Sequence, residues 1–274
     1  MRTLDGKVVV ITGAASGIGR ALALDAAGRG GRLALSDVDS AGLQETADLV
    51  REATGHEARL DKLDVRDRAA MKEYAASVAS DLGQVDVVVN NAGVALHGDF
   101  EDLDYEALEW IMDIDFWGVV NGTKEFLPYL IASGDGHLVN ISSLFGLLAV
   151  PGQSAYNAAK FGVRGFTEAL RQEMLVNKRP VQVTCVHPGG IKTAIARNAR
   201  AVGGDQAAQA DLFDSKLART TAEKAAEVIL DGALSGRARV LVGSDAKLLD
   251  LLVRLTGAGY QRLVAAAAGR TLPK

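Results

Sequence analysis

Residues 7–30 read "KVVVITGAASGIGRALALDAAGRG", a short β-branched run that breaks at glycines and continues as an Ala- and Leu-rich stretch of helical period. Further apolar runs, "RLALSD", "VDVVVN", "HLVNIS" and "VQVTCV", alternate with stretches long enough for a helix. Strands that read as continuous apolar runs between helix-length segments indicate a parallel sheet covered on both faces. The sequence therefore predicts a doubly wound α/β fold of Rossmann type, with three α/β/α layers and ligands at the carboxyl ends of the strands.

The composition narrows the class of protein. The chain has 274 residues, of which 48% are hydrophobic and 23% charged, and such a chain can bury a sizeable core. A net charge of −4 without a basic block offers no long-range attraction for nucleic acid or an anionic membrane. The single cysteine, Cys185, precludes an intrachain disulfide and suits a buried strand. Because no membrane span or signal peptide is recognisable, we expect a cytoplasmic protein.

The glycines after the first strand are typical of a nucleotide-binding turn. Gly13, Gly17 and Gly19 lead into a helix, where glycines let the backbone approach a pyrophosphate that faces the free amides of the helix N-terminus. The same triplet would also suit a tight strand-to-helix turn without a ligand. The triplet alone does not decide between the two interpretations.

Asp37 ends the second strand at about the separation from the glycines that is expected of an acid binding the adenosine ribose. A carboxylate there accepts hydrogen bonds from both ribose hydroxyls and repels a 2′-phosphate, so we expect NAD rather than NADP. Ser16 agrees, because no cation in the loop is positioned to neutralise an extra phosphate. Asp39 is the competing carboxylate, but it lies beyond the strand and is expected to cap the next helix.

The stretch "SAYNAAK" (154–160) places Tyr156 four residues before Lys160, so that both side chains share one face of a helix. A phenol with a pKa of about 10 is a poor base at neutral pH. Two unit charges about 4 Å apart interact by roughly 4 kcal/mol at an effective dielectric constant of 20, enough to lower the phenol's pKa by a few units before desolvation is subtracted. Taken alone, the pair is more typical of an amphipathic surface helix with a solvated lysine.

Five motifs occur in order: "TGAASGIG", "NNAG" at 90–93, Ser143, "YNAAK" at 156–160 and "HPGGIKT" at 187–193. On these motifs the chain resembles the classical short-chain dehydrogenase/reductase family over roughly residues 5–245. The resemblance implies an enzyme that passes a hydride between a nicotinamide and a carbonyl or carbinol carbon. It implies that Tyr156 exchanges the substrate proton beside Lys160 and that Ser143, rather than the neighbouring Ser142, holds the substrate oxygen.

The resemblance also implies the cofactor contacts. Asp64 and Val65 would contact the adenine, and the segment from Pro188 to Thr193 would hold the nicotinamide carboxamide. Asn90 either supports the central strand and helps leave room for the adenosine half of the cofactor, or it has a structural role that is unrelated to the cofactor. The residues expected to bind the cofactor are Gly13, Ser16, Gly17, Ile18, Gly19, Asp37, Asp64, Val65, Asn91, Ala92, Gly93, Tyr156, Lys160, Pro188, Gly189, Ile191 and Thr193, and no metal site is expected.

One catalytic position departs from the family pattern. Counting back from Gly118 in "MDIDFWGVVNGTK" places Asp115 where the family carries an asparagine, whose main-chain carbonyl holds a water that passes protons to the lysine. We expect Asp115 to keep this relay through its backbone and, if ionised, to raise the pKa of Tyr156 and move the activity optimum to higher pH. The alternative is that this helix tolerates either residue. Asn121 lies on a different helix face and cannot substitute.

The remaining chain predicts a catalytic domain over residues 1–245, including a substrate lid at 192–219, and a helical tail at 246–274. Thr220 and Glu223 have capping-box spacing at the helix that follows the lid. The tail carries a stripe, Leu248, Leu249, Leu252 and Leu255, expected to pack on another subunit or over the substrate cleft rather than on a membrane.

We expect a homodimer or homotetramer that oxidises a secondary alcohol or reduces a ketone on a hydrophobic skeleton. Four apolar residues are candidates to line the substrate pocket, or equally ordinary core residues: Leu96, Leu144, Phe145 and Val150. A non-catalytic, dinucleotide-binding regulatory protein is the alternative from another class. An epimerase or dehydratase with the same Tyr/Lys pair is disfavoured by the glycine spacing.

Overall fold

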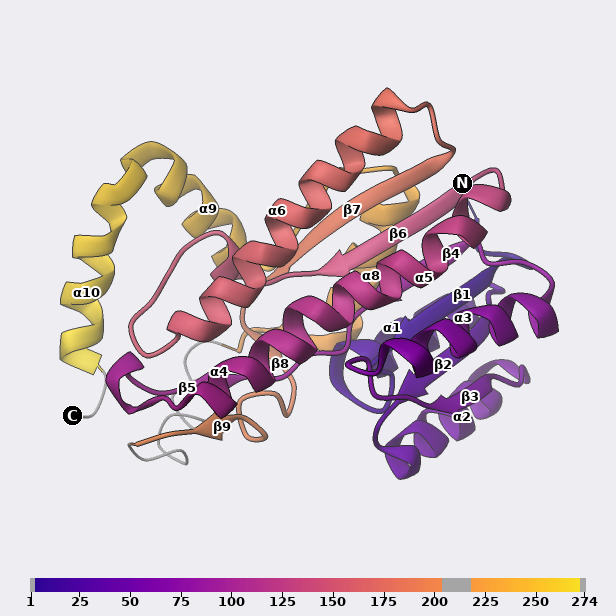
Figure 1. Ribbon diagram of the computed structural model, residues 1–274, viewed down its shortest axis with the longest axis horizontal. Helices are drawn as coiled ribbons and strands as arrows, with labels where there is room; N and C mark the ends of the chain where they lie inside the picture. Colours follow the sequence, from indigo (N-terminus) through magenta and orange to yellow (C-terminus); the bar gives the residue numbers. More distant parts are fainter. Residues whose placement is uncertain (1–2, 204–217, 272–274) are drawn as a thin grey trace.

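The computed structural model describes residues 3–203 and 218–271, and it consists of a central sheet with helices on both faces (Figure 1). All strand pairs of this sheet are parallel. In spatial order the strands are β11 (Arg239–Val242), β7 (Val181–Pro188), β6 (Gly136–Ile141), β4 (Val87–Asn90), β1 (Val8–Thr12), β2 (Arg32–Asp37) and β3 (Arg59–Lys62). This arrangement confirms the predicted Rossmann-type fold.

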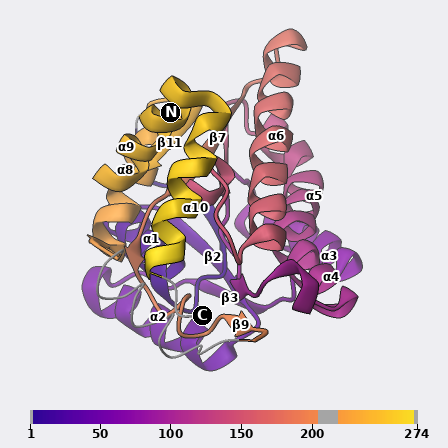
Figure 2. The same ribbon diagram turned by 90° about the vertical axis from the view of Figure 1, so that its left-hand side faces the viewer.

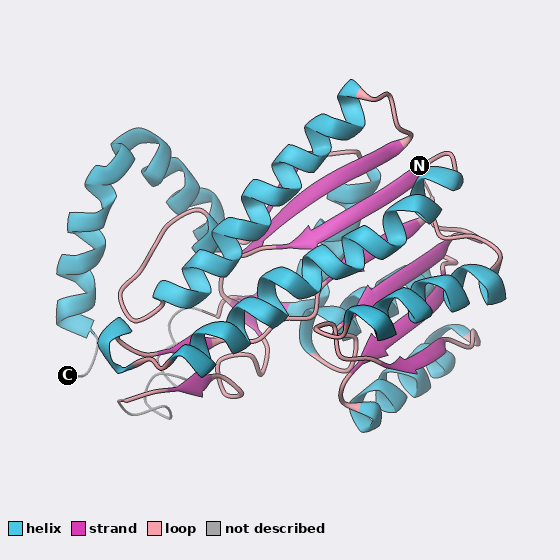
Figure 3. Cartoon of the chain, in the orientation of Figure 1, coloured by secondary structure: helices cyan, strands magenta, loops and turns pink. Residues whose placement is uncertain are grey.

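Helices cover both faces of the sheet, as Figures 2 and 3 show. One layer contains α1 (Gly17–Gly28), α2 (Ser40–Thr54) and α8 (Ala222–Leu234). The other contains α3 (Arg68–Leu82), α5 (Gly118–Ala132) and α6 (Ser154–Val176), with α4 (Tyr105–Met112) beside α6. Side chains alternate across β1, since Val9 and Ile11 pack on the first layer and Val8 and Val10 on the second. Burial on both faces explains why the strands read as unbroken apolar runs.

The order of the strands reverses between β1 and β4. From β1 the chain builds outward through β2 to β3, and it then crosses over to β4 and continues through β6 and β7 to β11. The crevice outside the carboxyl ends of β1 and β4 is therefore the topological switch point, where doubly wound sheets bind ligands. The glycine loop and "NNAG" follow these two strands, which places both at that crevice.

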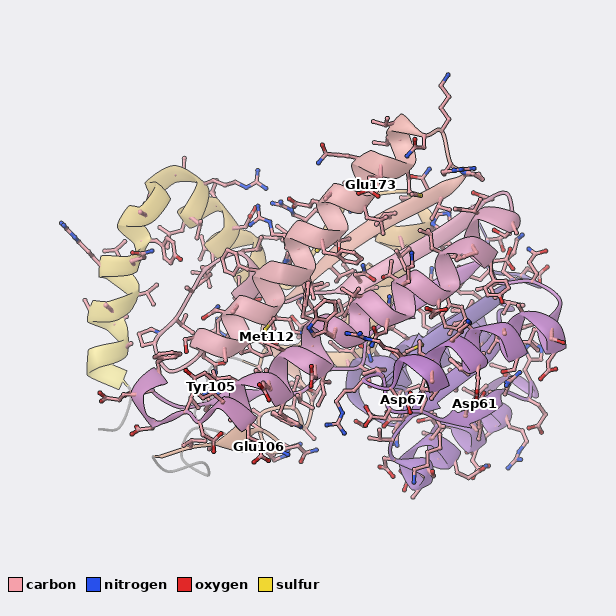
Figure 4. All side chains as sticks on the ribbon, viewed as in Figure 1. Asp61, Asp67, Tyr105, Glu106, Met112 and Glu173 are labelled. Carbon is pink, nitrogen blue, oxygen red and sulfur yellow. The ribbon has the colours of Figure 1, made fainter. Side chains whose placement is uncertain are left out.

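Helix caps confirm one sequence expectation and correct another. Asp39 caps α2, as expected, by accepting hydrogen bonds from the backbone N–H groups of Ala41 and Gly42. Asp67, labelled in Figure 4, caps α3 in the same way. The cap of α8 is Thr221 rather than the expected Thr220, and its side chain accepts a hydrogen bond from the backbone N–H of Lys224. The short strand β10 (Thr220–Thr221), in which Thr220 pairs with Ile191 of β8 (Ile191–Lys192), leads directly into this helix.

The segment expected to form the lid is described only in part. It begins with β8, continues to β9 (Arg200–Ala201), which pairs with β5 (Leu96–His97), and resumes at residue 218. Residues 204–217 of the expected lid lie outside the described residues.

The tail forms two helices, α9 (Ser244–Thr256) and α10 (Tyr260–Thr271), joined by a short 3₁₀ turn (Gly257–Gly259) and drawn in yellow in Figure 1. It packs on the loop that follows Ser143, where Ala246 and Tyr260 join Leu147 and Leu148 in one apolar cluster. The Tyr260 hydroxyl accepts a 2.9 Å hydrogen bond from the backbone N–H of Ala149.

The leucine stripe of the tail does not face in a single direction. Leu249 packs against the apolar cluster and Leu252 is half-buried, whereas Leu248 and Leu255 are exposed. Across the described parts of the chain, every helix is too short or too polar to cross a membrane.

Candidate active site

The glycine loop is shaped by contacts that only glycine permits. A Cβ at Gly19 would lie 2.0 Å from the carbonyl oxygen of Gly13, and a Cβ at Gly13 would lie 2.6 Å from Cα of Ala92. Gly13 also has φ +66°, in the left-handed region. The loop therefore turns tightly into α1 and lies directly against the "NNAG" segment.

Asn91 fastens these two segments together. Its Nδ2 donates to the carbonyl oxygens of Thr12 and Gly13, each at 3.0 Å, while the Thr12 hydroxyl accepts from the backbone N–H groups of Asn91 and Ala92. Asn90 instead points into the protein and donates to Asn140 at 2.9 Å. The structure therefore favours the structural role for Asn90 that the sequence left open.

Asp37 is half-buried at the carboxyl end of β2 and touches the glycine loop. Its Oδ2 accepts from the backbone N–H of Ala15 at 2.9 Å, and its Oδ1 accepts from the N–H of Asp39 at 3.0 Å. Each carboxylate oxygen has two lone pairs, so both keep capacity for a ligand hydroxyl. The cation nearest to the loop in sequence, Arg20, bonds to Thr46 and Glu45.

At the end of β3, Asp64 and Val65 have different surroundings. The guanidinium of Arg66 hydrogen-bonds Asp64 and holds the pKa of this carboxyl below its usual value. Val65 is buried, and its carbonyl accepts from Asn121. Asp64 is therefore already paired with a cation, which its sequence context did not indicate.

A buried ion pair lies at the centre of the site. Nζ of Lys160 is 3.0 Å from Oδ2 of Asp115, and both residues are almost fully buried. Asp115 lies in a π-helical turn (Asp113–Trp117) between α4 and α5, and its Oδ1 accepts from the backbone N–H of Val94 at 2.8 Å. A Cβ at Gly93 would lie 3.3 Å from Nζ, so this glycine leaves room for the ammonium.

Lys160 and Asp115 influence the ionisation of Tyr156 in opposite directions. The ammonium lies 5.6 Å from the centre of the Tyr156 ring. Burial and the nearby Asp115 raise the pKa of Tyr156, whereas Lys160 and a hydrogen bond with Ser143 lower it. Burial is the largest of these influences, so the pKa of Tyr156 lies above its usual value. Burial alone would lower the pKa of Lys160, but Asp115 and Tyr156 raise it above its usual value, which keeps the side chain protonated.

The two serines after β6 do different things. The Ser142 hydroxyl is buried and donates to the carbonyl oxygen of Lys160 at 2.8 Å. Ser143 is only half-buried, and its hydroxyl accepts from the N–H of Phe145 at 3.0 Å, which leaves the hydroxyl proton for Tyr156 or for a ligand. Phe145 packs edge-on against Tyr156, with ring centres 6.1 Å apart. Ser143 is therefore the better placed of the two serines to meet a ligand.

The segment after β7 closes the site from the other side. Thr193 reaches the glycine loop, since a Cβ at Gly17 would lie 3.2 Å from its Cγ2. Backbone hydrogen bonds hold the segment to β11, where Gly189 donates to Val242 at 2.9 Å. The structure therefore brings the glycine loop and the "HPGGIKT" segment, far apart in sequence, into contact.

Two supporting residues escaped the sequence analysis. Asp245, at the start of α9, accepts a 2.7 Å hydrogen bond from the backbone N–H of Gly190. His187 is buried, its Nδ1 lies 2.9 Å from the carbonyl oxygen of Ser143, and burial lowers its pKa to about 4, so it is neutral. The position of His187 inside "HPGGIKT" was a usable signal, but nothing in the sequence links Asp245 to a loop 55 residues earlier.

Burial separates the four candidate pocket residues. Leu96 and Leu144 are buried in different apolar clusters, whereas Phe145 and Val150 are partly exposed at the cluster that the tail covers. Cys185, as expected, is a buried strand residue.

The comparisons with known proteins agree with this geometry. A family model described as short chain dehydrogenase matches residues 7–202. The chain is 58% identical over 274 residues to the Mycobacterium tuberculosis protein named "Putative oxidoreductase SadH", covering 100% of this chain and 99% of that protein.

Solved structures are similar over most of the chain. A short chain dehydrogenase/reductase from Burkholderia phymatum in complex with NAD matches with a TM-score of 0.87 and 29% identity, over 95% of this chain and 97% of that one. An alcohol dehydrogenase from Thermococcus sibiricus complexed with 5-hydroxy-NADP matches with a TM-score of 0.73 and 26% identity, over 86% and 95%. These two proteins share the fold but are bound to different dinucleotides.

Proposed function

The chain belongs to the short-chain dehydrogenase family, an oxidoreductase family, and on that basis we propose that it transfers a hydride between NAD(H) and a secondary alcohol or ketone. The observation that supports the proposal is the cluster of Ser143, Tyr156 and Lys160, in which the ammonium lies 5.6 Å from the centre of the phenol ring. The ammonium also lies beside Gly93, which follows β4 at the switch point. A phenol, a hydroxyl donor and a fixed cation together suit proton exchange with an alcohol oxygen.

The described residues fit a dinucleotide. The loop from Gly13 to Gly19 leaves no room for side chains between its turn and "NNAG", which lets a pyrophosphate approach the N-terminus of α1. The residues proposed to hold the loop side of the cofactor are Gly13, Ser16, Gly17, Ile18, Gly19, Asp37, Asp64, Val65, Asn91, Ala92 and Gly93. Pro188, Gly189, Ile191 and Thr193 would hold the nicotinamide end, which supplies or accepts the hydride when the cofactor is bound.

Asp37 supports NAD as the preferred dinucleotide. Its carboxylate keeps free lone pairs for two ribose hydroxyls, and its charge would repel a 2′-phosphate. Arg20, which could otherwise neutralise that phosphate, is held by Glu45. The expected preference for NAD over NADP therefore rests on the Asp37 side chain and not on the fold.

The proton chemistry belongs to Tyr156. In oxidation Tyr156 would take the proton of the substrate hydroxyl, and in reduction it would return that proton to the alkoxide oxygen. Lys160 favours the phenolate through its charge. Ser143 has a hydroxyl proton to donate to the substrate oxygen, which would hold the developing alkoxide in place.

Asp115 is proposed to tune this chemistry. Its carboxylate stands 3.0 Å from the ammonium of Lys160, so it offsets part of the cation's effect on Tyr156. We retain the hypothesis that the backbone of Asp115 serves the proton relay while its charge moves the activity optimum to higher pH.

The proposal is tested by a panel of secondary alcohols and ketones assayed with NAD and NADP side by side. Reduction of NAD by at least one alcohol class, and a preference for NAD, are the expected results. A preference for NADP would refute the role of Asp37. NAD binding without turnover of any compound would favour the regulatory protein instead. The cytoplasmic location and the homodimer or homotetramer stay predictions.

A further inference from the structure

A polar pair, Gln153 and His97, lies next to the proposed catalytic residues and is not used by the chemistry derived above. Gln153 occupies the N-cap position of α6, and His97 is the second residue of β5. Nε2 of Gln153 lies 2.6 Å and 2.9 Å from the two ring nitrogens of His97. The two side chains come from segments 56 residues apart, so tertiary structure rather than chain proximity joins them.

Gln153 and His97 together have a hydrogen-bonding group that the described residues do not satisfy. Gln153 is 6% exposed, and its Oε1 has no hydrogen-bond partner among residues 3–203 and 218–271. Burial lowers the pKa of His97, so its ring is neutral and offers one donor and one acceptor nitrogen. Buried amide oxygens in folded proteins are nearly always paired, and one that is left over is an unusual feature that a bound ligand would satisfy.

Both residues lie in segments that adjoin Tyr156. Gln153 is the N-cap residue of α6 and precedes Tyr156, in the first turn of that helix, by three residues. Leu96, adjacent to His97, belongs to the apolar cluster that Tyr156 packs against. Met112, labelled in Figure 4, packs against the same cluster. The N–H of Gly98 donates to the carbonyl of Gly152 at 3.0 Å, which ties the two segments together beside the phenol.

We propose that Gln153 and His97 form a specificity site for a second hydroxyl group on the substrate, one that is separate from the reacting carbinol. This inference rests on the proposed function, since it concerns the substrate of the same site. A hydroxyl suits the pair in particular because it can donate to Oε1 as oriented, or accept from Nε2 if the amide is turned over. A carbonyl group would serve only the second orientation. The preferred substrates are therefore diols, or hydroxyketones in the reverse direction, on an otherwise apolar skeleton.

The size of the effect follows from leaving a buried polar group unpaired. A site built to hydrogen-bond a substrate hydroxyl discriminates strongly against the analogue that lacks it, because the amide then stays unsatisfied in the complex. We expect kcat/KM for the best diol to exceed that of the alkanol of equal chain length by roughly tenfold, which lies within the range expected for leaving one buried polar group unpaired.

The experiment compares three diol series, with hydroxyls on adjacent carbons and with one or two carbons between them, against alkanols and ketoalcohols of equal length. Wild type is measured beside Gln153→Leu and His97→Phe, with NAD and saturating cofactor. Gln153→Leu should lose most of the diol preference by lowering kcat/KM for the diol and raising it for the alkanol. Gln172→Leu on the exposed face of α6 is the matched control and should keep the preference.

The outcomes separate the two proposals. Three results in alcohol oxidation would each overturn the specificity site: turnover of alkanols with no diol preference in any series, a higher kcat/KM for ketoalcohols than for diols, or an unchanged diol preference in Gln153→Leu. Absence of turnover with every compound would count against the proposed function. In that case the specificity site is still tested by the melting temperature of the NADH complex, measured with each diol and each alkanol. An equal shift in melting temperature for diol and alkanol would overturn the specificity site.

Discussion

Replacing Asp115 by asparagine should move the pH dependence of alcohol oxidation. The side chain keeps an oxygen for the N–H of Val94 and its approximate volume, but the charge beside Lys160 is removed. With the anion gone, the pKa of Tyr156 falls, because Asp115 raises it. Tyr156 must be deprotonated to accept the alcohol proton, so the rising limb of log kcat/KM moves to lower pH.

The size of this shift can be worked out from two distances. Nζ of Lys160 lies 3.0 Å from Oδ2 of Asp115 and 5.6 Å from the Tyr156 ring centre, so Oδ2 is within about 8.6 Å of that centre. At an effective dielectric constant of 20, unit charges at this separation interact by about 2 kcal/mol, which corresponds to about 1.4 pKa units. Because Asp115 also raises the pKa of Lys160, the descending limb at high pH should move down as well.

The assay is steady-state oxidation of the best alcohol of the panel across a series of buffers of constant ionic strength. Asp113→Asn is the matched control, since it removes the same charge from an exposed position two residues away. An unchanged profile for Asp115→Asn would remove Asp115 from the proton chemistry. An equal shift in Asp113→Asn would mean that the net charge of the protein, rather than the buried pair, sets the profile.

Three further substitutions test other parts of the site. Tyr156→Phe should lower kcat by about 10²–10⁴ while fluorescence titration shows NADH binding unchanged, and retained activity would exclude the phenol as the proton carrier. Asp37→Ser should weaken NAD binding and move the ratio of kcat/KM for NAD and NADP toward NADP by roughly tenfold or more, and a constant ratio would dismiss the repulsion argument. Asp245→Ala removes the charged partner of the Gly190 N–H, so KM for NAD should rise by roughly tenfold with kcat little changed, because a hydrogen bond to a charged group contributes about 1.5–3 kcal/mol. An equal loss in kcat would point to wider damage than a displaced cofactor loop.

The sequence predicted those parts of the molecule that depend on local pattern. The apolar runs identified the strands, and Asp39 was recognised as a cap because capping is decided within a few residues. The capping-box prediction at Thr220 was wrong by one residue, because α8 begins only at Ala222, after a strand pairing of Thr220 and Thr221 that the local sequence does not indicate.

Contacts between distant segments could not be predicted in this way. The partnership of Gln153 with His97 and the hydrogen bond from Gly190 to Asp245 depend on tertiary side-chain placement that no spacing rule specifies. The ion pair at Asp115 was anticipated as a charge near the lysine, but its 3.0 Å separation follows from the π-helical turn that carries it.

The attachment of the tail to the loop after Ser143 bears on how this enzyme could diversify. Every residue proposed for cofactor binding or proton exchange lies at or before Thr193, whereas the contacts on that loop come from Ala246 and Tyr260. Exchange of the stretch beyond Asp245 between relatives would thus change the packing on the loop after Ser143 and replace none of the residues proposed for cofactor binding or proton exchange. Laboratory evolution of new substrate ranges could accordingly begin with libraries confined to these last two helices.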